Sequence, residues 1–267
     1  MSRSVPRFRP LGLRLFEAGV MGMLLMLTAS ALRGQFYEGT GMTFGQNRIQ
    51  TREYTWQYLP AGDVEVYYYQ GGSELAGRVV GLLPALRKEV EGTLDRNLEG
   101  PIQVIVYNHL QEFRESNIGA QLEGGENIGG TARLVGSKLF LFGTGETDHL
   151  IRDLRAGLSR ILFNQIMYGG QWQDALRNSS LITFPDWYRE GLYRYVGEPW
   201  SAATAGAVLD AALRGRIVRV QQANGEEAAL LGHAIWKYVG DVFGPAVMAN
   251  VLYMTRVSRS PESGFLF

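Results

Sequence analysis

The stretch DHLIRDLRAGLSRILFNQIMY, residues 148–168, separates a region with both strand and helix patterns from a region with helix patterns alone. Its apolar residues recur at intervals of three and four, which predicts one long helix with a buried face. Short β-branched and aromatic runs before it predict strands, at 64–69, 102–107 and 139–142. Between these runs, helical spacing predicts helices at 73–98 and 110–116, and residues 36–58 are expected to form an extended lead-in.

The sequence after this stretch carries helical patterns throughout. Helices are expected at 186–197, 201–214, 228–243 and 245–257. We therefore expect an α+β fold, with a small mixed sheet and its helices in residues 36–146. A helical lobe of the same domain, residues 147–267, is expected to follow.

Composition narrows the classes of function. The 267 residues include no cysteine, which excludes disulfides, cysteine nucleophiles and cysteine metal ligands. Lysine and arginine (26) balance aspartate and glutamate (26), and nothing indicates the clustered basic surface that nucleic-acid binding needs. The sequence has no Gly-x-Ser-x-Gly motif for a serine nucleophile and no phosphate-binding P-loop.

The N-terminus is typical of an export signal. Four arginines between Arg3 and Arg14 give a basic start, and an apolar run from Val20 to Ala29 follows. Small residues after the run predict cleavage between about 30 and 36, so residues 1–35 are expected to be a signal peptide. The alternative is an uncleaved anchor, although a membrane-spanning helix needs roughly 20 apolar residues. We expect the protein in the periplasm or associated with the outer membrane.

A second stretch, PDWYREGL at residues 185–192, carries a family resemblance. An aromatic pair, one variable residue, Glu190, Gly191 and an apolar residue resemble the third-ligand helix of peptidase MA-like (gluzincin) domains. Together with LGHAIWKY at 231–238, the chain looks like an exported bacterial group in which such a domain precedes a TolB-like β-propeller. The resemblance covers residues 36–267 and implies a zincin-like fold.

The zinc motif of that superfamily is missing. There, one helix reads His-Glu-x-x-His, because positions i and i+4 share a face and the Glu activates the metal-bound water. Glu190 stands where the resemblance places the third ligand. In the preferred register, Arg155 and Ser159 take the two His positions and Ala156 takes the Glu position.

A second register remains open, with His149 and Asp153 at the His positions and Leu150 at the Glu position. Both registers lack the general base. We therefore expect no catalytic residue, no metal and no cofactor, and a vestigial site made of Arg155, Ala156, Ser159 and Glu190. We also expect an Arg155–Glu190 salt bridge in place of the metal. His109 and His233 have no ligand partner at i+4 and are expected to be structural or surface residues.

These observations favour an inactive peptidase-like binding or scaffold domain of an exported envelope protein. The expected partner is an envelope protein or polypeptide segment. One alternative is an active zinc metallopeptidase with an unrecognised ligand set, and another is a purely structural lobe. The chain ends on apolar Phe265-Leu266-Phe267, which we expect to be frayed or packed on a patch that a following domain, such as a propeller, would cover.

Overall fold

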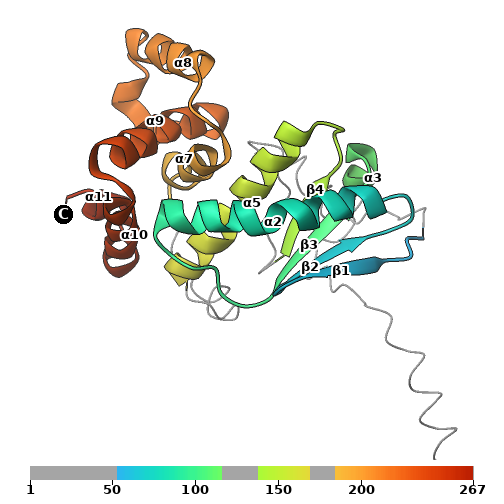
Figure 1. Ribbon diagram of the computed structural model, residues 1–267. Coiled ribbons are helices and arrows are strands. Elements are labelled where there is room, and N and C mark those ends of the chain that lie inside the picture. Colours follow the sequence, from blue (N-terminus) through green and yellow to red (C-terminus); the bar gives the residue numbers. More distant parts are fainter. Residues whose placement is uncertain (1–52, 116–137, 169–183, 267) are drawn as a thin grey trace, which may run out of the picture. The chain divides into compact units, whose positions relative to one another are not determined.

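The computed structural model describes residues 53–115, 138–168 and 184–266. They form an α+β fold, in which a four-stranded mixed sheet with helices is followed by a helical C-terminal lobe (Figure 1). The predicted fold class is therefore confirmed. The predicted signal peptide, residues 1–35, and Phe267 lie outside the described residues. No helix in the described part of the chain is long and apolar enough to cross a membrane.

The sheet has the order β1-β2-β3-β4. Its strands are β1 (Gln57–Ala61), β2 (Val64–Tyr68), β3 (Ile102–Tyr107) and β4 (Lys138–Phe142). β1 and β2 are antiparallel, whereas β2–β3 and β3–β4 are parallel. The register aligns Val66 with Val104 and Val104 with Leu139, so one face of the sheet is continuously apolar.

β1 was not predicted as a strand, because its first two residues fell in the expected lead-in. The strand lies at one edge of the sheet and most of its residues are exposed. Only Leu59 and Ala61 pack against the core, and Pro60 between them weakens the sequence pattern by which strands are recognised. The turn that joins it to β2 contains Gly62, whose positive φ of 69° suits a glycine.

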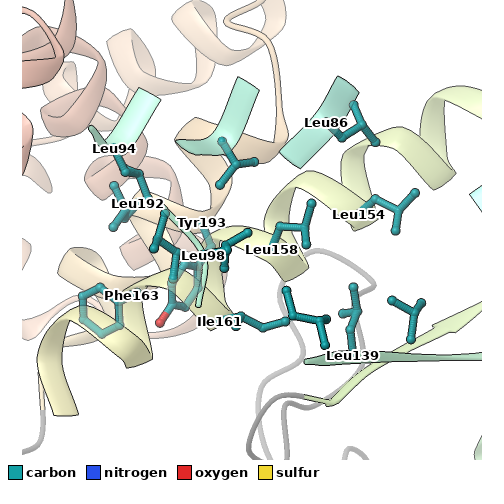
Figure 2. Packing of buried hydrophobic residues seen from close by; sticks show 14 of the residues in the cluster. Leu86, Leu94, Leu98, Leu139, Leu154, Leu158, Ile161, Phe163, Leu192 and Tyr193 are labelled. Atoms are coloured by element: carbon teal, nitrogen blue, oxygen red, sulfur yellow. The ribbon is translucent and has the colours of Figure 1, made fainter. Parts of the chain in front are cut away.

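Two long helices cover the apolar face of the sheet. They are α2 (Ser73–Leu94) and α5 (Thr147–Tyr168), and a short helix, α3 (Leu110–Glu115), follows β3. Figure 2 shows Leu154 and Leu158 of α5 close to Leu139 of β4, with Leu86 of α2 in the same core. Gly157 lies against Leu139, where a β-carbon would overlap the leucine side chain. α5 therefore packs closely on the sheet.

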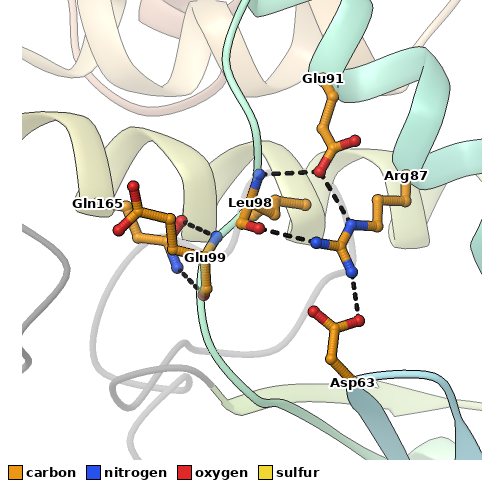
Figure 3. Close-up of polar contacts among 6 residues, drawn as sticks. All are labelled: Asp63, Arg87, Glu91, Leu98, Glu99 and Gln165. Atoms are coloured by element: carbon orange, nitrogen blue, oxygen red, sulfur yellow. Dashed lines mark hydrogen bonds and ion pairs between the residues drawn. The ribbon is translucent and has the colours of Figure 1, made fainter.

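Helix α2 ends at Leu94, four residues before the predicted end at 98. Asp95 adopts a left-handed conformation with φ 49°, which terminates the helix. Figure 3 shows how the following segment is held: Arg87 donates to the Leu98 carbonyl at 2.7 Å and also pairs with Asp63. Polar contacts of the half-buried Arg87 thus fix the connection to β3.

The C-terminal lobe is helical. Its elements are α7 (Asp186–Gly197), α8 (Ala202–Leu213), the 3-10 helix η2 (Ile217–Gln222), α9 (Gly225–Phe243), α10 (Pro245–Ser258) and α11 (Pro261–Gly264). α7 and α9 cross at Gly191 and Gly232, where added β-carbons would overlap the backbone of the other helix. The Trp236 indole N–H donates to the Tyr188 carbonyl at 2.8 Å beside this crossing. The pair is therefore in direct backbone contact.

The apolar end of the chain does not behave as one unit. The Phe265 ring is half-buried and packs against Trp187 and Trp236 at the edge of the core, whereas Leu266 is 83% exposed. Leu266 is thus exposed as predicted, Phe265 is packed rather than frayed, and Phe267 lies outside the described residues.

Candidate functional site between helices α5 and α7

Arg155 does not contact Glu190. Its guanidinium instead binds Glu89 of α2, with Nη2 2.5 Å and Nε 2.7 Å from the same carboxylate oxygen. The side chains of Arg155 and Glu89 are 29% and 52% exposed. The predicted Arg155–Glu190 salt bridge is therefore wrong, because Arg155 lies on the side of α5 that faces α2.

Glu190 has a different arginine as its partner. Arg160 Nη2 donates to Glu190 Oε2 at 2.7 Å, and the two side chains are only 14% and 13% exposed. The Arg160 guanidinium carbon also lies 4.9 Å from the centre of the Tyr193 ring, within the range of a cation–π contact. An arginine–glutamate pair thus does join α5 to α7, but it comes from Arg160.

The cavity beside this pair reveals which face of α5 meets α7. Arg152, Ala156 and Arg160, each four residues from the next, line it together with Glu190. Ser159 does not, since it is fully buried and its hydroxyl donates to the Ala156 carbonyl at 2.8 Å. The α5 positions opposite Glu190 at i and i+4 are therefore Ala156 and Arg160, one residue later than the preferred register.

If Ala156 and Arg160 take the two His positions, the position of the general base falls on Gly157. It has no side chain, and its Cα faces Leu139 of the sheet. Of the four predicted residues of the vestigial site, the structure brings together Ala156 and Glu190 and leaves Arg155 and Ser159 elsewhere. The residue that sequence reasoning missed is Arg160. The sequence feature that could have indicated Arg160 is Ala156, one turn earlier. Its small side chain lets α5 and α7 approach closely at Gly197.

The residues of the second register, His149 and Asp153, do meet. His149 Nδ1 and Asp153 Oδ2 are 2.9 Å apart, without the alignment of a hydrogen bond. Asp153 is 2% exposed, and burial raises its pKa to about 7 although Arg152 and Arg160 lower it. Burial likewise lowers the pKa of His149. The environment thus disfavours the charged form of both groups, and Leu150 at the base position is part of the core.

The remaining charges around the cavity are matched. Arg194 lies 3.0 Å from Glu198 and also binds Glu226, and Arg152 lies 3.9 Å from Glu198. These contacts link α7 to α5 and to α9. The cavity that they surround has a volume of about 40 Å³, which suits a water molecule rather than a substrate.

The side chains at this position do not fit a zinc ion. Arginine offers only donors and alanine offers no lone pair, so Glu190 is the single ligand among the three groups that face one another. Within residues 53–115, 138–168 and 184–266, no group of three or more His, Asp or Glu side chains is arranged to hold a metal. What this arrangement does chemically is join two helices through a shielded ion pair.

His233 of α9 is the second candidate. It has no exposed surface, and neither ring nitrogen has a hydrogen-bond partner among the described residues. It lines a cavity of about 260 Å³ with Trp200, Tyr195 and Lys237. Sequence reasoning took it for a structural or surface residue. Its apolar helical neighbours could have indicated a buried position, but not the cavity.

Comparison with known proteins adds no assignment. No protein-family model matches the chain. A search among curated proteins likewise returned no match.

Proposed function

We propose that the domain is a non-catalytic binding domain of an exported bacterial envelope protein. The observation that carries the proposal is the shielded Arg160–Glu190 pair beneath Tyr193. The sequence resemblance implies a zinc ion at this position, and a guanidinium there repels any cation. The carboxylate that would bind the metal is already used as the acceptor of a charge-assisted hydrogen bond.

The absence of a base supports the same proposal. A hydrolase of this type needs a side chain that takes a proton from water, and the position after Ala156 is Gly157. A side chain there would collide with Leu139. The buried Asp153 does not take its place, because its side chain is only 2% exposed and does not line the cavity beside Glu190.

The partner that we propose is a polypeptide segment of another envelope protein. A cavity of about 430 Å³ lies on the far side of α5 from Arg160, lined by Lys88, Glu89 and Thr93 of α2, Arg155 of α5 and residues of α7, α9 and α10. Its size falls in the range of ligand-binding clefts, about 300–1,000 Å³. It contains both charged and apolar side chains, as a site for a peptide requires.

Two measurements on the full chain test this proposal. The first is the zinc content of the protein after gel filtration, together with its hydrolysis of casein and of mixtures of fluorescence-quenched peptide substrates. We expect far less than one zinc per chain and no chelator-sensitive hydrolysis. One equivalent of zinc with hydrolysis that a chelator abolishes would establish a peptidase instead.

The second measurement concerns binding. Peptides that tile the envelope proteins of the host are arrayed and probed with the wild-type chain and with Thr93→Trp, which fills the cavity. Gly206→Ala on α8, where a β-carbon has open space, is the matched control. Peptides retained by wild type and control but lost in Thr93→Trp would support a binding domain. If the folded wild-type chain binds none of the peptides, a purely structural lobe is favoured.

A further inference from the structure

The imidazole of His233 is unusual for a buried group. It is 0% exposed, yet neither Nδ1 nor Nε2 has a hydrogen-bond partner among the described residues. Buried polar groups are nearly always paired, and an unpaired one costs about 1–3 kcal/mol. The position therefore calls for a partner that is not part of the described chain.

Aromatic rings surround this imidazole. Trp200, in the connection between α7 and α8, stands edge-on to it with the ring centres 5.1 Å apart at 87°. Tyr195 of α7 lies on another side at 6.1 Å and 70°. All three side chains line the same cavity of about 260 Å³, so His233 forms its inner wall and the two rings frame it.

The charges at this cavity cancel. Lys237 binds Asp241 one turn later on α9, and Glu198 at the other end binds Arg194. Burial lowers the pKa of His233 to about 4, with smaller contributions from Arg194 and Lys237, so the imidazole is neutral near pH 7. A neutral imidazole offers one donor and one acceptor. The cavity therefore presents no unpaired charge to an ion.

We propose that this cavity binds a neutral sugar ring, with a hydroxyl group on His233 and an apolar ring face against Trp200. A hydroxyl both donates and accepts, so it can satisfy either imidazole nitrogen. Binding pockets typically combine aromatic walls with a few polar groups, and about 260 Å³ lies just below their usual range, which suits a single ring. Because His233 is 0% exposed, a ligand reaches it only when a neighbouring side chain moves.

The cavity also has room for an attached second unit. Thr93, Tyr195 and Val196 line both this cavity and the neighbouring one of about 430 Å³. The site uses Tyr195 and Val196 of α7, whereas Tyr193, Arg194 and Gly197 face the cavity beside Glu190. Glu198 lines both cavities, but Arg160 and Glu190 line only the one beside α5, so the proposal of a sugar site stands whether or not the chain lacks peptidase activity.

The experiment uses the full chain labelled with ¹⁵N-histidine, which has only three histidines to assign. Glucose, galactose, N-acetylglucosamine and cellobiose are titrated to millimolar concentration, and sodium phosphate serves as the charged probe. The signals of His233 are identified by their loss in His233→Gln. We expect at least one saccharide to shift them saturably and to leave the His109 signals unchanged.

A second variant, Trp200→Ala, checks the aromatic wall. The residue lies half-buried in a connection, so the fold should persist, which circular dichroism verifies. Loss of one aromatic contact should weaken saccharide binding roughly threefold to tenfold. The proposal is overturned if no saccharide moves the His233 signals, if only phosphate does, or if His109 shifts in parallel. Unaltered affinity in Trp200→Ala would overturn the assigned ring face.

Discussion

The Arg160–Glu190 pair allows a sharp test of how the two helices are held together. Replacing Arg160 with Met leaves the Glu190 carboxylate, only 13% exposed, without its hydrogen-bond donor, and replacing Glu190 with Gln removes the negative charge that Arg160 Nη2 binds. Breaking a fully buried pair costs about 3–5 kcal/mol. Residual exposure and the small adjoining cavity reduce this, so we expect a loss of about 2–4 kcal/mol for either variant. Arg160→Met also loses the Tyr193 contact, worth about 0.5–1 kcal/mol.

The double variant separates the interaction from the two single losses. Urea unfolding of all four proteins, followed by far-UV circular dichroism, should give a coupling free energy of about 1–3 kcal/mol. Arg155 and Glu89 provide the matched control, since they also join α5 to a neighbouring helix but are 29% and 52% exposed. For that pair we expect about 0–1 kcal/mol, falling further with added salt.

Equal coupling free energies in the two cycles, or single losses at Arg160 and Glu190 that simply add, would contradict this expectation. Either outcome would mean that the contact between the two side chains contributes no specific stability and that apolar packing alone fixes α5 against α7. A coupling that disappears at high salt would show that water reaches the pair freely.

Three further outcomes are expected in the same unfolding assay. Gly191→Ala should cost at least about 3 kcal/mol because its β-carbon overlaps the backbone at Gly232, whereas Gly206→Ala, with open space, should be neutral or slightly stabilising. Burial raises the pKa of Asp153 to about 7, so its contribution to stability is full below pH 4 and is lost as pH rises toward 7; Asp153→Asn should remove this slope and be the more stable protein at pH 8. The pKa of His233 is lowered to about 4, so its effect on stability runs in the opposite direction. The free energy of unfolding is unaffected by His233 above pH 6.5 and falls by about 3 kcal/mol by pH 4, because the unfolded chain takes up the proton first. His233→Gln should abolish this loss. A pH profile that both variants leave unchanged would contradict the two assignments.

Much of the fold follows from local pattern. The long helix at 148–168 and the helix at 186–197 match α5 and α7 within a residue, because each carries an apolar face with a period near 3.6. β1 escaped prediction because only two of its residues, Leu59 and Ala61, pack against the core and because Pro60 lies between them. The early end of α2 escaped because it depends on the backbone of Asp95 and on Arg87, which binds the segment beyond it.

The site was harder to predict for a physical reason. Pairs at i and i+4 occur at every position of a helix, so Arg155 with Ser159 and Ala156 with Arg160 satisfy the same spacing. Only packing decides which pair meets α7, since a shift of one residue rotates the side chain by about 100°. Here the choice is made by Gly157 against the sheet and by Gly197 against Ala156, contacts between segments distant in sequence.

Helix α7 connects the features that this chain presents. One face binds α5 through Glu190 and Arg160, and another meets α9 at Gly191 without intervening side chains. Tyr195, further along α7, contacts Gly240 of α9 and lines the cavity of His233. A helix fixed on two sides holds a ligand-binding wall with little reorganisation, which favours affinity. Breaking the Arg160 pair should therefore weaken saccharide binding through the position of Tyr195, while the neutral state of His233 stays as it is. Such a loss, with unchanged histidine signals in the free protein, would link the Arg160–Glu190 pair to the rigidity of the proposed saccharide site.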